Sequence, residues 1–253
     1  MEISTKFIDV FKVKKKELVT PHYMRITFHI PARLITKFKN ILDGSNNKLF
    51  IPPEGTNVIY FPNIQNRYVL EESIAKVRTY TNRKIDLINQ ELKIDFVLHK
   101  KYGPGSFWAS NSKIGDAIGI GLKQGIKTLI PKFKHYTLIG DHTALPLISV
   151  ILENLSEDTQ AEVLLEVYDS SDELLLSSSA KTNIRWIHNQ NPEKGSQLGN
   201  KSKAILKNKK KHDTYVYIAA EYSTVHELKN YLKEYLLWNN SNYNAVVFWS
   251  RSK

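Results

Sequence analysis

Cysteine is missing from this chain of 253 residues. Its absence excludes disulfide bonds, thiolate nucleophiles and iron–sulfur clusters ligated by the chain itself. Any redox function would therefore depend on a bound organic cofactor.

Long apolar runs are missing as well. No stretch of about 18 residues is apolar enough to span a bilayer. The first ten residues alternate apolar and charged positions and lack the apolar core of a signal peptide. We expect a cytoplasmic protein that does not insert into a membrane.

Common motifs of nucleotide, hydrolase and metal sites are also absent. The sequence has no Gly-x-Gly-x-x-Gly fingerprint, Walker loop or Gly-x-Ser-x-Gly elbow, and its eight histidines form no His-x-x-x-His pair. We expect no metal bound by protein ligands. A dinucleotide bound in the second half of the chain would not be held in the usual Rossmann manner.

Positive charge is in excess, because the formal net charge is +11. Such a surface attracts an anionic partner, which leaves nucleic acid, an acidic membrane, or an acidic small molecule with a phosphate-bearing cofactor. The densest basic cluster, residues 207–212, contains no interleaved aromatic residue. This favours a solvated helix end over nucleic-acid binding, and a basic barrel that binds single strands stays a secondary alternative.

The first half of the chain has the pattern of an antiparallel sheet or barrel. Gly, Pro and Asn residues separate short alternating segments, and we interpret residues 43–48 with Pro52 and Pro53 as loop. A weak helical pattern covers residues 31–38. The six predicted strands are Phe7–Lys16, Tyr23–Ile30, Val58–Phe61, Val77–Asn82, Glu91–His99 and Ala117–Leu122.

The second half alternates strands with helices, which predicts a mostly parallel sheet. Thr224 and Glu227 form a capping box and predict a helix over residues 224–238. Ligand sites in such sheets lie at the carboxyl ends of strands, here after Ile139, Tyr168 and Ala219. We expect a β-barrel domain over residues 1–130 and an α/β domain over residues 131–253. The predicted strands are 136–139, 162–168, 184–188, 214–219 and 245–249.

One hexapeptide has the chemistry of a flavin site. Arg78 and Arg83 supply planar donor forks for a pyrophosphate, Tyr80 supplies a ring that can stack on an isoalloxazine, and Thr81 supplies a hydroxyl for the flavin edge. An ordinary edge strand would explain the same alternation. The position of the motif in a β-rich domain that precedes an α/β domain favours the flavin.

Two further segments have turn chemistry suited to anions. Gly103, Pro104, Gly105 and Ser106 allow backbone N–H groups to approach a phosphate at the start of a short helix, although for this segment taken alone a plain turn is the better explanation. The second segment, Asp141 to Pro146, follows a strand and opens a helix, where capping alone would account for it.

In these segments the chain resembles the siderophore-interacting protein family. Members of that family are flavin-dependent ferric-siderophore reductases with a domain arrangement like that of ferredoxin reductases. The resemblance extends over nearly the whole chain. It implies an FAD-binding antiparallel six-stranded barrel followed by an α/β domain of the NAD(P)H-binding type. The motifs that carry it are residues 19–25, 78–83, 94–99, 103–109 and 140–146 and the ending at Trp249.

The resemblance also implies which residues bind FAD. Gly105 stands where the family usually has Ala, and the ending 248–253 departs from the usual aromatic-Trp-Arg-x-Gly strand. The implied cofactor-binding residues are Arg78, Tyr80, Thr81, Arg83, His99, Gly103, Pro104, Gly105, Ser106, Trp108, Asp141, Thr143 and Ala144.

By the same resemblance, FAD would accept electrons from NADH or NADPH and reduce Fe(III) in a ferric siderophore, with reduced ferredoxin as the alternative donor. Glu221, at the end of a predicted strand, is a candidate for the nicotinamide side or a helix cap. Lys229, Arg251 and Lys253 are candidates for the rim of a pocket for an anionic siderophore, and loose surface charge is the alternative explanation.

Overall fold

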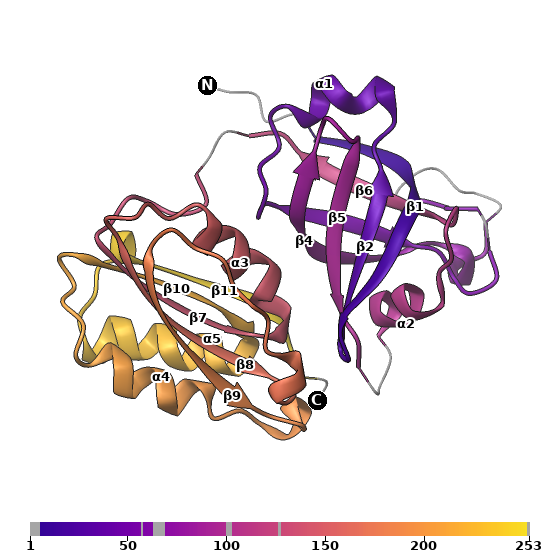
Figure 1. Cartoon of the computed structure of the whole chain (residues 1–253). Helices are drawn as coiled ribbons and strands as arrows, with labels where there is room; N and C mark the ends of the chain where they lie inside the picture. Colours follow the sequence, from indigo (N-terminus) through magenta and orange to yellow (C-terminus); the bar gives the residue numbers. More distant parts are fainter. Residues whose placement is uncertain (1–5, 57, 63–68, 100–102, 126–127, 252–253) are drawn as a thin grey trace. The chain divides into compact units, whose positions relative to one another are not determined.

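The structure is a computed structural model that describes residues 6–56, 58–62, 69–99, 103–125 and 128–251. The chain divides into two compact units, Met1–Thr128 and Leu129–Lys253 (Figure 1). Lys253 lies outside the described residues.

The first unit is a closed antiparallel barrel with the strand order β1-β2-β5-β4-β3-β6. Its interior is filled by alternate apolar side chains, including Phe11, Ile26, Leu49, Ile94 and Ile120, none of which is exposed to solvent. This confirms the predicted barrel of six strands. The strands are β1 (Lys6–Thr20), β2 (Tyr23–His29), β3 (Asn46–Ile51), β4 (Lys76–Asp86), β5 (Glu91–Val97) and β6 (Ala117–Lys123).

One of the six predicted strands was wrong. Residues 58–61 form only an isolated bridge between Tyr60 and Ile74, and the barrel is completed by β3, within a stretch that the sequence assigned partly to loop. Because β3 begins with polar residues, the sequence pattern did not indicate a strand there. The side chain of Asn47 is buried and its Nδ2 donates to Oδ1 of Asn82 at 2.7 Å, so a polar residue takes an interior position by pairing with another.

Two short helices accompany the barrel. The weak helical pattern before residue 38 corresponds to a 3₁₀ turn (Ala32–Leu34) followed by α1 (Ile35–Phe38). Helix α2 (Pro104–Asn111) follows β5, with Pro104 in its first turn, where the missing N–H costs little.

The second unit is a five-stranded parallel sheet with the order β11-β10-β7-β8-β9. Helices α4 and α5 lie against one face and α3 lies against the other (Figure 1). This confirms the predicted parallel sheet. Its elements are β7 (His135–Asp141), α3 (Leu145–Glu153), β8 (Gln160–Val167), β9 (Lys181–His188), α4 (Leu198–Leu206), β10 (Thr214–Glu221), α5 (Tyr222–Asn230) and β11 (Tyr243–Trp249).

The last long helix begins two residues before the predicted capping box. Glu221 is its N-cap, and its carboxylate accepts a hydrogen bond from the Ser223 N–H at 2.8 Å. Thr224 is buried instead. A π-helical turn (Tyr231–Tyr235) follows α5, so the regular helix also ends earlier than expected.

Candidate functional site

The hexapeptide singled out in the sequence lies within β4, where its side chains meet different environments. Arg78 is exposed, and its Nη1 donates to the carbonyl of Val77 at 2.8 Å. Thr81 is buried, and Arg83 is largely covered, with 15% of its side chain exposed. The strand therefore presents one accessible guanidinium and one that is embedded in the fold.

Tyr80 links β4 to helix α2. Its ring packs on Phe96 with 4.6 Å between the ring centroids. A Cβ atom added to Gly105 would lie only 2.1 Å from the Tyr80 hydroxyl, so glycine is what lets the helix approach the ring this closely. Burial raises the pKa of Tyr80 to about 12, which keeps the phenol neutral at physiological pH.

The first turn of α2 lacks a side-chain cap. Its N-cap is Gly103, which contributes no side-chain hydrogen bond to the helix. The Ser106 hydroxyl instead accepts from the backbone N–H of His99 at 3.1 Å, which ties the exposed end of β5 to the helix. Backbone N–H groups at such a helix start favour an anion. The sequence placed His99 and Gly103–Ser106 in one site, and the structure brings them together.

Trp108 lies on the barrel side of α2. Its ring stacks on Phe28 with 6.1 Å between centroids and also packs against Phe96. This packing accounts for a tryptophan at the position, and contact of Trp108 with a cofactor stays a prediction.

The chemistry of these groups fits a flavin dinucleotide. An exposed guanidinium and an uncapped helix start suit a pyrophosphate, and a neutral aromatic ring with a neighbouring hydroxyl suits an isoalloxazine. Because Gly105 approaches Tyr80 closely, the start of α2 lies beside the part of β4 that carries the aromatic ring.

The sequence did not reveal an arginine–aspartate–arginine cluster beside this motif. Asp95 accepts from Arg25 through both oxygens, with Nε–Oδ1 at 2.7 Å and Nη2–Oδ2 at 2.8 Å. The Nε of Arg83 lies 3.9 Å from Oδ2 of the same carboxylate. Arg25 and Asp95 both occur in motifs that carry the resemblance, but only strand register makes them neighbours.

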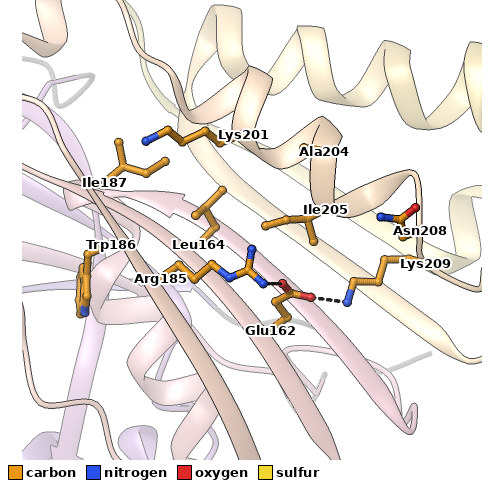
Figure 2. A pocket seen from close by; sticks show the side chains of 10 residues that line it. All are labelled: Glu162, Leu164, Arg185, Trp186, Ile187, Lys201, Ala204, Ile205, Asn208 and Lys209. Atoms are coloured by element: carbon orange, nitrogen blue, oxygen red, sulfur yellow. Dashed lines mark hydrogen bonds and ion pairs between the residues drawn. The ribbon is translucent and has the colours of Figure 1, made fainter.

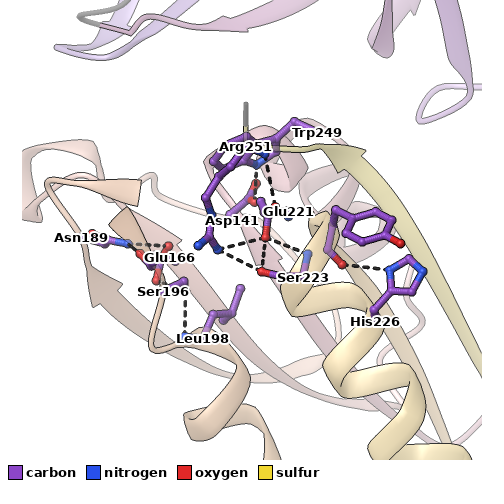
Figure 3. A network of polar contacts seen from close by, with 12 residues as sticks. Asp141, Glu166, Asn189, Ser196, Leu198, Glu221, Ser223, His226, Trp249 and Arg251 are labelled. Atoms are coloured by element: carbon purple, nitrogen blue, oxygen red, sulfur yellow. Dashed lines mark hydrogen bonds and ion pairs between the residues drawn. The ribbon is translucent and has the colours of Figure 1, made fainter. Parts of the chain in front are cut away.

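In the second unit, buried carboxylates line the carboxyl edge of the parallel sheet (Figure 3). Asp141 ends β7, Glu166 lies opposite it on β8, and Glu221 ends β10. Each of the three residues is at most 6% exposed. The strand ends named from the sequence therefore do meet at one edge.

Asp141 accepts four hydrogen bonds within this unit. Its Oδ1 accepts from the N–H and the hydroxyl of Thr143 at 2.9 and 2.6 Å. Its Oδ2 accepts from the backbone N–H of Glu221 at 2.9 Å and from Nε1 of Trp249 at 2.8 Å. Burial raises the pKa of Asp141, and these bonds oppose the rise. Asp141 thus joins the ends of β7, β10 and β11.

Ala144 is a packing residue of this unit. It is fully buried, and a Cβ atom added to Gly140 would lie 2.6 Å from the Ala144 methyl. The pair allows α3 to approach β7 closely. Thr143 retains partial exposure, so it is the residue of this turn best placed to contact a ligand.

Arg251 is an ion-pair partner of Glu221. Its Nη2 lies 3.0 Å from Oε2 of Glu221 and 3.1 Å from the Ser223 hydroxyl (Figure 3). Burial alone would raise the pKa of Glu221, but the bonds from Ser223 and Arg251 outweigh it and lower the pKa. Arg251 is therefore engaged at the carboxyl edge, whereas the exposed Lys229 lies in the last turn of α5, at the other end of that helix.

Glu166 was not recognised from the sequence. Its carboxylate accepts from Nδ2 of Asn189 at 3.0 Å and from the Ser196 hydroxyl. Burial raises the pKa of Glu166, an effect that these two hydrogen bonds oppose. A hollow of about 310 Å³ lies beside it, lined in part by Lys194 and Gln197. An acidic residue near the end of a strand, directly after the apolar run 163–165, was the available signal.

A larger hollow of about 510 Å³ lies between β9 and α4 (Figure 2). Its polar wall is an ion-pair network in which Glu162 binds Arg185 at 2.9 Å and also binds Lys209.

The basic cluster 207–212 makes contacts within the second unit. Besides the pair of Lys209 with Glu162, Lys211 donates to the carbonyls of Leu236 and Leu237 at 3.3 Å. Two lysines of the basic cluster 207–212 therefore have structural partners.

Within the described part of the chain, no group of three or more His, Asp or Glu side chains is arranged to hold a metal ion. Among the same residues, no helix has the length and apolar character needed to cross a membrane.

Comparisons with protein families match both units. Residues 12–125 match the siderophore-interacting FAD-binding domain, and residues 133–252 match the siderophore-interacting protein domain. The ferric vibriobactin reductase ViuB of Vibrio cholerae is 26% identical over 241 residues, which are 94% of this chain and 88% of that protein. The ferric acinetobactin reductase of Acinetobacter baumannii is 25% identical over 195 residues, or 74% of this chain and 66% of that protein.

Solved structures agree with these matches. The siderophore-interacting protein SipS from Aeromonas hydrophila superposes with a TM-score of 0.79 at 25% identity, covering 97% of this chain and 92% of that one. Phthalate dioxygenase reductase has the same fold, with a TM-score of 0.61 at 13% identity over 95% of this chain and 68% of that one.

Proposed function

This chain belongs to the siderophore-interacting protein family, and from that premise we propose that it is an FAD-dependent ferric-siderophore reductase acting in the cytoplasm. The observation that carries the proposal is the meeting of the Arg78–Arg83 segment of β4 with the start of α2, which Tyr80 and Gly105 join. Relatives that match most or much of the chain are named for ferric vibriobactin and ferric acinetobactin reduction.

In this proposal the barrel unit holds FAD, and its residues bind and orient the cofactor. Arg78 and the backbone N–H groups of the first turn of α2 bind the phosphates. Tyr80 supplies a neutral ring, Thr81 a hydroxyl for the flavin edge, and Arg83 a second guanidinium. When bound, FAD supplies the conversion between two-electron donation by a nicotinamide and one-electron reduction of Fe(III).

The proposed substrate is an anionic ferric siderophore, which the net charge of +11 would attract. Reduction to Fe(II) weakens the hold of hard oxygen ligands on the metal, so iron leaves without a protein ligand. A Lys- and Arg-rich rim would steer the substrate, and Lys229, Arg251 and Lys253 stay candidates for it. Arg251 would have to act while bound to Glu221.

For the electron donor we propose NADH or NADPH at the carboxyl edge of the second unit's sheet, near Glu221. Ligands of such sheets bind where strand order reverses, here between β7 and β10. Reduced ferredoxin is the second candidate, because an acidic protein would also suit a chain of this charge.

The test begins with purified protein reconstituted with FAD. We expect a yellow protein whose flavin band bleaches anaerobically with NADH, NADPH or reduced ferredoxin, and the effective donor identifies the electron source. Added ferric siderophore should restore the band while a ferrous-specific chelator reports Fe(II).

A pair of variants tests the FAD site. Arg78→Ala should weaken FAD binding, whereas Arg33→Ala, which removes an exposed arginine paired with Asp9, should not. A protein that stays colourless after reconstitution would overturn the proposal.

A further inference from the structure

Lys16 lies on the interior side of the barrel wall, although lysine side chains are mostly exposed in folded proteins. Residues directly opposite each other in an antiparallel ladder point to the same face of the sheet. Lys16 lies opposite Ile26, and Val13 lies opposite Phe28; Ile26, Val13 and Phe28 are all buried in the barrel core. A register shift between Val13 and Lys15 moves the interior side of β1 from odd-numbered to even-numbered residues, which turns Lys16 inwards.

The Lys16 ammonium binds the end of helix α2. Its Nζ donates to the carbonyl of Ser112 at 2.6 Å and to the carbonyl of Ser110 at 3.1 Å. The last carbonyls of a helix have no partner within the helix, and a cation at that end also interacts favourably with the helix dipole. Burial lowers the pKa of Lys16, an effect that the charge of Asp116 opposes. Strand β1 therefore supplies an anchor for the carboxyl end of α2.

Helix α2 depends on such contacts because it is short. Its eight residues make about two turns, and a helix of that length is not stable without tertiary packing. Gly105 fits against Tyr80 near its start, and Lys16 holds its end. Loss of the contact at either end would let the whole helix shift, including the first turn.

We propose that Lys16 is a positioning residue of the flavin site, which acts through α2 and holds the N–H groups of its first turn where the phosphates of FAD bind. The inference rests on the proposed function, because FAD is the ligand of that proposal. Lys16 does this without touching the cofactor. A helix that is already held in place loses less freedom when FAD binds.

The test measures the Kd of the apoprotein for FAD by flavin fluorescence, together with thermal unfolding of the apoprotein. Lys16→Met keeps an apolar stem and removes the ammonium, and it should raise the Kd about tenfold, which corresponds to about 1.4 kcal/mol. The matched control is Lys14→Met on the same strand. Lys14 also donates to a backbone carbonyl, that of Asn89 at 3.4 Å, and pairs with Glu91 at 2.8 Å. The control should leave the Kd within about twofold.

A double-mutant cycle with Gly103→Asp separates positioning from general stability. Gly103 is the N-cap of α2, with φ −73° and ψ 162°, and a Cβ atom added there meets nothing within 4 Å, so aspartate fits. Its carboxylate would bond the N–H groups of the first turn and repel a phosphate, so Gly103→Asp should raise the Kd without destabilising the apoprotein. If Lys16 acts through the start of α2, Lys16→Met should have little further effect on the Kd once Gly103→Asp is present.

An equal effect of Lys16→Met with and without Gly103→Asp would overturn the inference, as would a wild-type Kd for either single variant. Should Lys16→Met fail to fold, Lys16→Gln, which retains a side-chain N–H donor but no charge, decides by the same cycle. If wild type itself binds no FAD, the proposed function fails instead.

Discussion

Replacing Asp141 with alanine should destabilise the second unit far more than the loss of a helix cap alone would. The substitution removes the cap of the turn at residues 142–144, which is worth about 1 kcal/mol. It also leaves the Glu221 N–H and the Trp249 indole N–H without their acceptor, at about 1–2 kcal/mol each. We expect Asp141→Ala to lower the free energy of unfolding by about 3–5 kcal/mol in total.

The lower end of that range is the more realistic one. Burial raises the pKa of Asp141, so the ionised carboxylate carries a desolvation cost that the alanine variant no longer bears. A domain with a typical stability of about 5–15 kcal/mol would stay folded but lose much of its margin.

Asp169 provides a matched control for this prediction. It accepts the same pair of local bonds, from the N–H and hydroxyl of Ser171 at 2.8 and 2.6 Å. Asp169 is partly exposed, so Asp169→Ala should cost less than Asp141→Ala, and the loss of its cap accounts for about 1 kcal/mol. The two variants compare the loss of a cap on a partly exposed residue with the loss of a cap and of the bonds that the buried Asp141 makes to β10 and β11.

Urea unfolding followed by tryptophan fluorescence measures both variants. Three of the four tryptophans, Trp186, Trp238 and Trp249, belong to the second unit, and Trp249 donates directly to Asp141. Because two units can unfold separately, the transition that carries this signal is the one to compare. Equal losses for Asp141→Ala and Asp169→Ala would refute the assignment of stability to the bonds between strands.

Three further outcomes are expected. The raised pKa of Glu166 means that its contribution to stability is full at low pH and is lost as pH rises through the folded-state pKa, so Glu166→Gln should flatten the pH dependence of urea unfolding above about pH 4.5. Arg251→Ala should cost about 1 kcal/mol at low salt and less in 1 M salt, because its pair with Glu221 is partly exposed; a loss independent of salt would contradict an ion pair. Gly105→Ala should displace Tyr80 and change the absorption band of bound FAD, and an unchanged spectrum would place the flavin away from this ring.

Local patterns predicted much of the fold. Alternating segments indicated the barrel, and strands followed by helices indicated the parallel sheet, because burial on one or both faces imposes a period on the sequence. The exception, β3, begins with Asn46 and Asn47, whose interior placement depends on Asn82, a residue 35 positions away from Asn47. A strand with a polar start of this kind gives no local signal at that end.

The start of α5 likewise depended on a neighbouring strand and not on the local sequence pattern alone. Thr224 and Glu227 matched a capping box, yet Glu221 caps α5, because the end of β10 brings its carboxylate to Ser223. Both residues could cap a helix, and Glu221 does so because it is the last residue of β10.

What the sequence determined by itself is the chemistry of the chain: no cysteine, an excess of positive charge, and the ordered motifs at Arg78–Arg83, His99–Trp108 and Asp141–Ala144. Only the tertiary structure decided which of those groups act together. It enclosed Asp95 between Arg25 and Arg83, bound Arg251 to Glu221, and joined Asp141 to Trp249. The physical reason is that residue type fixes what a side chain can bind, whereas strand register and burial fix what it meets.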